Sequence, residues 1–289
     1  MGPRGFAQDK GRFGRILIAD DDPVCLKLVS TMVNTLGFAA DTAITGDEAV
    51  RAVQRFDYFA VLMDCQMPVM DGYQATGLIR ALSQPEKARV PIVGISAGDS
   101  EEDLKRCLAA GMNDYVAKPV KLPKLKLLLH NWLRHETSFE SDGDLNPSPK
   151  LEAMGANGVL DERIYQDLVQ LGRDTGTDIV GELIRTFVET APACIEDVEH
   201  AVNVSDAFLL SRSAHRLRGS AFNLGAGNLG KVCLDIDGCA RRGDFARAHD
   251  LVDRLRVAFM TVVSTLRERV GRDKKLRDVL SRSISDESN

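Results

Sequence analysis

The chain has 289 residues, which is long for one hydrophobic core and suits two, so we expect two domains. Its 44% hydrophobic residues, 27% charged residues and net charge of −5 are typical of a folded soluble protein and argue against a nucleic-acid-binding protein. No apolar run approaches the ~18 residues of a membrane span, and the six cysteines show no Cys-x-x-Cys spacing. We expect a cytoplasmic protein with reduced thiols, no direct membrane insertion, and neither a zinc site nor a disulfide framework.

Short apolar runs alternate strictly with helical patterns over residues 15–135. Strict alternation of this kind predicts an α/β fold with a doubly wound, five-stranded parallel sheet. The expected strands lie at 15–19, 41–44, 60–64, 91–95 and 114–117, and the expected helices at 23–36, 46–56, 72–82, 100–110 and 122–133.

Beyond this segment the composition and the periodicity both change. Residues 136–160 are rich in Ser, Asp, Gly, Asn and Pro, which indicates a linker, and only helical periods follow, which favours an all-α antiparallel bundle. Its expected helices lie at 180–202, with a kink at Pro192, and at 206–223, 227–242 and 245–270. The expected organisation is a flexible N-terminal arm (1–14), the α/β domain (15–135), the linker (136–160), the helical bundle (161–270) and a charged C-terminal tail (271–289).

Polar side chains stand at the carboxyl ends of four expected strands. Asp20 and Asp21 follow the first strand, and Asp64 ends the third. Ser96 ends the fourth strand, and Lys118 follows the fifth. Ligands of open α/β sheets bind at this edge, so we expect the five side chains to converge there. Crowded carboxylates repel one another unless a hard cation joins them, and Mg²⁺ prefers few carboxylates together with waters and phosphate oxygens.

This set of groups suits phosphoryl transfer onto a carboxylate. We expect Asp64 to be the nucleophile, with Mg²⁺ and Lys118 neutralising the phosphoryl oxygens and Ser96 donating a hydrogen bond to one of them. The product would be an acyl phosphate on Asp64. Taken singly, the features have plainer interpretations, because an Asp run before Pro is usually a turn or a helix cap and a Lys-Pro pair usually lies in a loop.

With these motifs the sequence resembles the receiver domains of two-component response regulators, which have a flavodoxin-like fold. The likeness covers residues 15–134. It rests on four motifs in the family's order: Ile-Leu-Ile-Ala-Asp-Asp-Asp-Pro (16–23), Met-Asp-Cys-Gln-Met-Pro-Val-Met-Asp-Gly (63–72), Gly-Ile-Ser-Ala (94–97) and Tyr-Val-Ala-Lys-Pro (115–119).

The resemblance implies metal ligands and a switch. It implies that Asp21, Asp64 and the backbone carbonyl of Gln66 bind Mg²⁺, with Asp20 acting partly through water. Tyr115 matches the switch aromatic of the family, whose ring changes position as the hydroxyl at the Ser96 position is drawn towards the phosphoryl group.

The resemblance also implies a cis Lys118-Pro119 bond, which only an X-Pro pair makes inexpensive. Two positions depart from the commonest family pattern. Ser96 stands where Thr is frequent and keeps the hydroxyl, and Asp22 stands where Asn is frequent and adds a negative charge that would alter metal affinity.

In the helical half, the segment around His215 stands out. Arg218 and Gly219 lie three and four residues further on and share its helix face, so Arg218 supplies a cation for a phosphoryl oxygen. A glycine inside a helix costs about 1 kcal/mol relative to Ala, and we expect it to leave room for a partner above the imidazole. The apolar stripe of this helix comprises Leu210, Ala214, Leu217, Ala221 and Leu224.

This segment is similar to histidine-containing phosphotransfer domains. The family pattern Ala-His-x-Leu-Lys-Gly-Ser is matched at 214–220, with Arg218 in place of the usual Lys, and the likeness extends over about 161–270. It implies that His215 carries a phosphoryl group on a ring nitrogen. The other four histidines are expected to be surface or capping residues.

Together the two halves predict a phosphorelay protein of a two-component pathway. The receiver would accept a phosphoryl group on Asp64, and the helical domain would carry one on His215, between a separate sensor histidine kinase or hybrid kinase and a downstream response-regulator receiver. A flexible linker of about 25 residues would reach about 25–30 Å and would allow transfer within one chain. Alternatively, the two domains serve different partners, and the receiver is a regulatory switch on the phosphotransfer domain.

Two rival functions belong to other classes. Phosphatases of the haloacid dehalogenase type also use an Asp nucleophile after a strand together with Mg²⁺, but they need a second acid two residues on, where Gln66 stands. A scaffold built on a degenerate receiver would lack acidic or lysine positions, and none is missing. No kinase or hydrolase core is expected, so any enzymatic activity would be limited to self-dephosphorylation.

Overall fold

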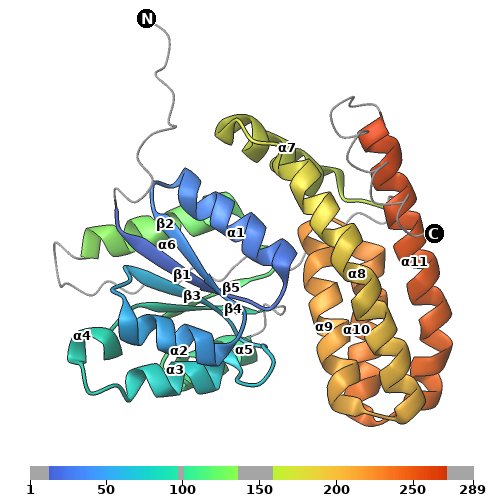
Figure 1. Cartoon of the computed structure of the whole chain (residues 1–289), viewed down its shortest axis with the longest axis horizontal. Coiled ribbons are helices and arrows are strands. Elements are labelled where there is room, and N and C mark those ends of the chain that lie inside the picture. Colours follow the sequence, from blue (N-terminus) through green and yellow to red (C-terminus); the bar gives the residue numbers. More distant parts are fainter. Residues whose placement is uncertain (1–12, 97–100, 136–158, 272–289) are drawn as a thin grey trace, which may run out of the picture. The chain divides into compact units, whose positions relative to one another are not determined.

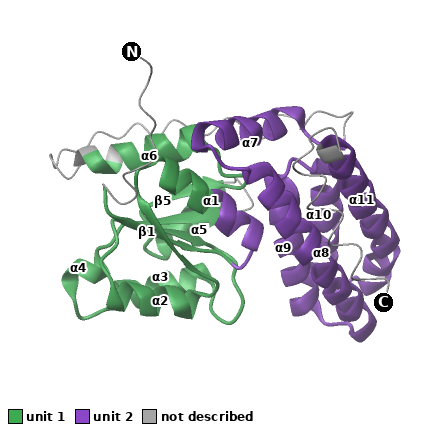
Figure 2. Cartoon of the chain, turned by 45° about the horizontal axis from the view of Figure 1, so that its top comes forward, with its two compact units in different colours: residues 1–20, 29–154 green, residues 21–28, 155–289 purple. Residues whose placement is uncertain are grey.

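The computed structural model describes residues 13–96, 101–135 and 159–271. The chain divides into two compact units, residues 1–20 with 29–154 and residues 21–28 with 155–289 (Figure 2). Most of the predicted N-terminal arm, linker and C-terminal tail lies outside the described residues. The limits predicted for the domains therefore stay predictions.

The first unit is built on five strands: β1 (Arg15–Ala19), β2 (Ala39–Ala43), β3 (Ala60–Asp64), β4 (Ile92–Ser96) and β5 (Asp114–Ala117). They form one sheet in the order β2-β1-β3-β4-β5, with every neighbouring pair parallel (Figure 1). All residues of β3 and β4 are buried, because helices cover both faces of a parallel sheet. The predicted doubly wound parallel sheet is confirmed.

Helices α1 (Pro23–Thr35) and α6 (Leu122–His135) lie on one face of this sheet (Figure 1). Helices α2 (Gly46–Arg55), α3 (Gly72–Arg80) and α5 (Glu101–Ala109) lie on the other. A short helix, α4 (Pro85–Ala88), was not predicted. The N-terminus of α3 has a capping box, in which the side chains of Asp71 and Gln74 each accept a hydrogen bond from the other's backbone N–H. This capping box fixes the point at which the turn after β3 gives way to α3.

Gly72, the first residue of α3, allows that helix to begin directly against the end of β3. A Cβ atom at this position would overlap the carbonyl oxygen of Asp64 and lie 2.9 Å from Cγ of Met63. By contrast, a Cβ atom on Gly77, in the middle of the same helix, would have no neighbour within 4 Å. A side chain at position 72 would therefore clash with its neighbours, whereas one at position 77 would not.

We expect Gly72→Ala to destabilise the first unit by about 2–3 kcal/mol, because the added methyl group overpacks the main chain of Asp64. Gly77→Ala should stabilise it by about 0.5–1 kcal/mol, since Ala has the higher helix propensity. The chain's single tryptophan, Trp132, lies on α6, so its fluorescence during urea unfolding of the full chain reports on this unit. Equal unfolding midpoints for the two variants would contradict the close approach at Gly72.

The second unit contains α7 (Glu162–Thr175), α8 (Ile179–Val204), α9 (Ala207–Asn223), α10 (Gly227–Arg242) and α11 (Phe245–Gly271). Helices α8 to α11 form a ring in which each packs on the next and α11 packs on α8, and α7 packs against α8. The turns between them are short, so neighbours run antiparallel, and the predicted bundle is confirmed. Pro192 lies inside α8, which continues past it. Helix α7 was not predicted as a separate helix. Among the described residues, no helix is long and apolar enough to cross a membrane.

Candidate functional site

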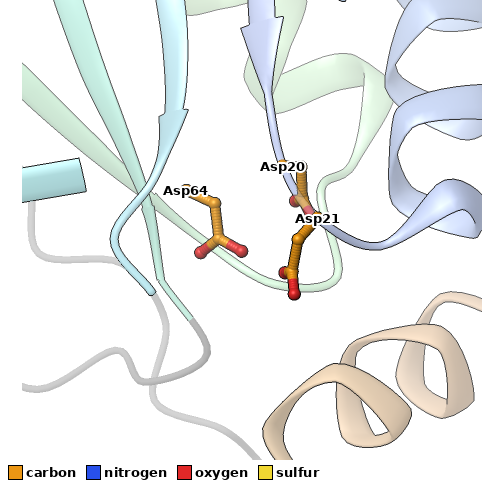
Figure 3. A group of neighbouring side chains, drawn as sticks. All are labelled: Asp20, Asp21 and Asp64. Carbon is orange, nitrogen blue, oxygen red and sulfur yellow. The ribbon is translucent and has the colours of Figure 1, made fainter. Parts of the chain in front are cut away.

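Three carboxylates meet at the carboxyl edge of the sheet. Asp20 and Asp21 follow β1, Asp64 ends the neighbouring β3, and one oxygen from each lies within 4.8 Å of the others (Figure 3). Asp20 and Asp64 are buried, and Asp21 is partly exposed. The cluster is therefore a compact set of hard oxygen donors of the kind that suits Mg²⁺.

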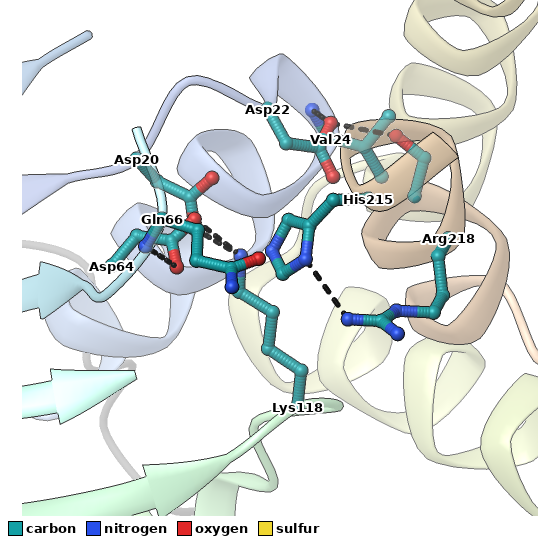
Figure 4. Close-up of polar contacts among 9 residues, drawn as sticks. Asp20, Asp22, Val24, Asp64, Gln66, Lys118, His215 and Arg218 are labelled. Carbon is teal, nitrogen blue, oxygen red and sulfur yellow. Dashed lines mark hydrogen bonds and ion pairs between the residues drawn. The ribbon is translucent and has the colours of Figure 1, made fainter. Parts of the chain in front are cut away.

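Lys118 binds two of these carboxylates from the end of β5. Its Nζ lies 2.8 Å from Oδ2 of Asp64 and 2.9 Å from Oδ2 of Asp20 (Figure 4). The side chain is only 3% exposed, so the ammonium group is held among the carboxylates rather than in solvent. The Lys118-Pro119 bond is cis, as the family resemblance implied. The structure thus brings together four of the predicted residues, Asp20, Asp21, Asp64 and Lys118.

The strand register places the hydroxyl residue beside this group. Asp64 on β3 pairs with Ile95 on β4, and Ser96 is the next residue along β4. The carbonyl oxygen of Ser96 also accepts a hydrogen bond of 2.7 Å from the backbone N–H of Lys118. The backbone N–H of Gln66 donates to Oδ1 of Asp64 at 3.2 Å, so the turn after β3 is bound to the carboxylate (Figure 4).

Two further residues singled out in the sequence lie close to these strand ends. Tyr115 on β5 is largely buried, with Nζ of Lys124 5.8 Å from its ring centroid. Oδ1 of Asp22 accepts the backbone N–H of Val24 at 2.9 Å where α1 begins. Asp22 is therefore a helix-capping residue, which gives its carboxylate a structural role.

On α9, His215 is buried and has a cation beside it. Nη2 of Arg218 lies 2.9 Å from Nδ1 of His215 (Figure 4). Because a guanidinium group only donates hydrogen bonds, Nδ1 accepts, and a neutral ring then carries its proton on Nε2. Gly219 is buried on the same helix. The predicted shared face of His215 and Arg218 is therefore a direct contact.

A buried acid on α10, which the sequence did not reveal, holds this arginine. Oδ2 of Asp237 lies 3.7 Å from Nη1 of Arg218 and 2.8 Å from Nη2 of Arg241, and Oδ1 accepts the hydroxyl of Ser211 at 2.5 Å. Asp237 is 1% exposed. The signal in the sequence is slight: an acidic residue beside the apolar Ile236, four residues before an arginine. Asp237 orients the cation that contacts His215.

Two family models match the chain in succession. The response regulator receiver domain matches residues 16–130, and the Hpt domain matches residues 182–271. The first match contains the three carboxylates and Lys118, and the second contains His215, Arg218 and Asp237. Each candidate site therefore lies within one matched segment.

The sensor protein GacS of Pseudomonas syringae pv. syringae is 30% identical over 244 residues, which is 81% of this chain and 26% of that protein. The sensory/regulatory protein RpfC of Xanthomonas campestris pv. campestris is 26% identical over 273 residues, which is 94% of this chain and 35% of that protein. The solved receiver domain of sensor histidine kinase PA1611 from Pseudomonas aeruginosa PAO1 is 42% identical, covers 42% of this chain and 97% of that chain, and has a TM-score of 0.39.

The chain spans only 26% and 35% of the two curated relatives. Within that span the two family models occur in the same order as the two parts expected from the sequence, with the receiver first. The chain therefore contains a response regulator receiver domain followed by an Hpt domain.

Proposed function

We propose that the chain is a phosphorelay intermediate in which Asp64 accepts a phosphoryl group and His215 carries one. The observation that supports this most is the buried contact of Lys118 with Asp64, at 2.8 Å, and with Asp20, at 2.9 Å. An ammonium group fixed on the attacking carboxylate is already in place to neutralise incoming phosphoryl oxygens, so little reorganisation is needed during transfer.

The donor set at the strand ends fits Mg²⁺. Asp20, Asp21 and Asp64 supply carboxylate oxygens within 4.8 Å of one another, and the backbone carbonyl of Gln66 is the further ligand that we propose. Bound there, the ion would neutralise charge on the phosphoryl group and orient it. Removal of Mg²⁺ with a chelator is therefore expected to stop phosphorylation of Asp64.

The chain's own groups account for the bonds that form and break. An oxygen of Asp64 forms a bond to phosphorus as the P–N bond of a phosphohistidine donor breaks, which leaves an acyl phosphate and a donor imidazole that takes up a proton. Ser96 donates its hydroxyl hydrogen to one phosphoryl oxygen, and Lys118 neutralises another. Tyr115 lies on β5, the strand next to the one that carries Ser96. Its ring is the aromatic group that changes position when the Ser96 hydroxyl is drawn towards the phosphoryl group.

At the second site a ring nitrogen of His215 attacks the phosphorus of an aspartyl phosphate, the acyl P–O bond breaks, the aspartate leaves as a carboxylate, and the ring releases one proton to solvent. Arg218 neutralises the transferred phosphoryl oxygens, held in place by Asp237, and Gly219 leaves space for the phosphoryl donor. The partners that suit this chemistry are a sensor histidine kinase or hybrid kinase as phosphoryl source and a downstream response-regulator receiver as acceptor.

A chase experiment tests whether the two sites exchange phosphoryl groups. The full chain is labelled with acetyl [³²P]phosphate and Mg²⁺, the donor is removed, and the base-stable label of phosphohistidine is followed over time. We expect label to move from Asp64 to His215 at a rate independent of protein concentration, as transfer within one chain requires. Label that never becomes base-stable would overturn the relay, and a rate that rises with concentration would show transfer between chains instead.

A further inference from the structure

Two cysteines in the receiver domain face one another next to the phosphoacceptor. Sγ of Cys65, the residue directly after β3 and Asp64, lies 3.6 Å from Sγ of Cys107 on α5. Both side chains are buried and both are free thiols. The two sulfur atoms are close enough that a bond between them requires an approach of about 1.5 Å, given an S–S length of about 2.05 Å.

The absence of a side chain on Gly94 of β4 leaves space for the two sulfur atoms. A Cβ atom on Gly94 of β4 would lie 2.9 Å from Sγ of Cys107 and 3.3 Å from Sγ of Cys65, so a larger residue would push the two sulfur atoms away. The main chain of Cys65 is fixed on both sides, since its N–H donates to Ile95 at 3.0 Å and its carbonyl accepts from Gly72 at 3.2 Å. A link to Cys107 would therefore connect α5 to the rigid end of β3.

A partly exposed side chain, that of Tyr73, packs against the buried cluster that contains both cysteines. Tyr73 is the second residue of α3, and the guanidinium of Arg106, next to Cys107, lies 4.9 Å from the Tyr73 ring centroid. Access of a small oxidant to the buried thiols would require this side chain to move.

We propose that Cys65 and Cys107 form a reversible disulfide that slows phosphorylation of Asp64. With a hydroperoxide as the oxidant, the two thiols lose two hydrogen atoms, one S–S bond forms, the O–O bond breaks, and hydrogen peroxide yields two waters. An approach of about 1.5 Å between the sulfur atoms would strain the hydrogen bonds that hold the main chain of Cys65 and shift it beside Asp64, and displacements of about 1 Å cost on the order of 100-fold in rate at a reacting group. This effect on rate rests on the proposed function, whereas formation of the disulfide does not.

The full chain is treated with hydrogen peroxide, digested without reduction and analysed by mass spectrometry. We expect a Cys65–Cys107 linked peptide that dithiothreitol releases. The linked peptide should be absent from Cys107→Ala and present in Cys233→Ala, which removes a buried cysteine of α10. Alkylation of both Cys65 and Cys107 in denatured samples after oxidation would overturn the disulfide.

The rate of Asp64 phosphorylation is measured on the same samples. Oxidation should slow it at least about tenfold in the wild type and in Cys233→Ala, dithiothreitol should restore it, and Cys107→Ala should be unaffected. A linked peptide with an unchanged rate would overturn the regulatory effect. If the reduced wild-type chain accepts no phosphoryl group at all, the proposed function is wrong. The mass spectrometry still shows, independently, whether the disulfide between Cys65 and Cys107 forms.

Discussion

Replacement of Asp64 with Asn is expected to lower Mg²⁺-dependent phosphorylation of the receiver by acetyl phosphate at least about 100-fold, because it removes the attacking oxygen. The amide also removes one of the two carboxylates that contact Lys118, at 2.8 Å, and one of the three donors for the metal. The measurement is incorporation of ³²P into the acid-stable, base-labile fraction of the full chain at fixed Mg²⁺.

The matched control is Asp57→Asn. Asp57 belongs to the same unit, but its side chain is 96% exposed and forms an ion pair with Lys87. Exposed ion pairs contribute little to stability, so this variant should fold and should be labelled at the wild-type rate. Wild-type labelling of Asp64→Asn, or equal loss in both variants, would show that the nucleophile has been assigned wrongly.

Replacement of His215 with Gln is expected to abolish base-stable phosphohistidine and to leave labelling of Asp64 within about twofold of the wild type. Gln keeps a polar side chain beside Arg218 but has no nucleophilic ring nitrogen. The measurement is the base-stable ³²P fraction after a labelled receiver, or the chain's own labelled Asp64, has been supplied as phosphoryl donor.

His200→Gln provides the comparison, because His200 lies on α8 in the same bundle and is exposed. It should accept phosphoryl groups as the wild type does. Retention of base-stable label in His215→Gln, or its loss in His200→Gln, would place the phosphohistidine elsewhere on the chain.

The receiver strands that carry the candidate site could be predicted because their apolar runs end at polar residues. Buried β3 and β4 have continuous apolar sequences, whereas the edge strand β2 consists of small and polar residues and begins two residues before the predicted start, at Ala39. Helix α4 has only four residues, which is too short for a helical period. In α7 only Leu168 and Leu171 are buried, so its apolar stripe is weak.

Contacts between distant side chains could be predicted only where the fold brings strand ends together. Parallel topology places Lys118 at the same edge as Asp64, so their proximity follows from the order of the strands. No comparable rule connects Asp237 on α10 to Arg218 on α9, or Cys107 on α5 to Cys65, because helix packing decides which faces meet. Such pairs become visible only in the folded structure.

The position of the acyl phosphate on the chain can be determined chemically. The wild-type chain is phosphorylated with Mg²⁺ and acetyl phosphate and then treated with borohydride, which reduces an aspartyl phosphate to homoserine, and peptide mass spectrometry locates the altered residue. We expect homoserine at position 64, and only when Mg²⁺ is present during phosphorylation. Homoserine at another acidic residue, with Asp64 unaltered, would contradict this expectation.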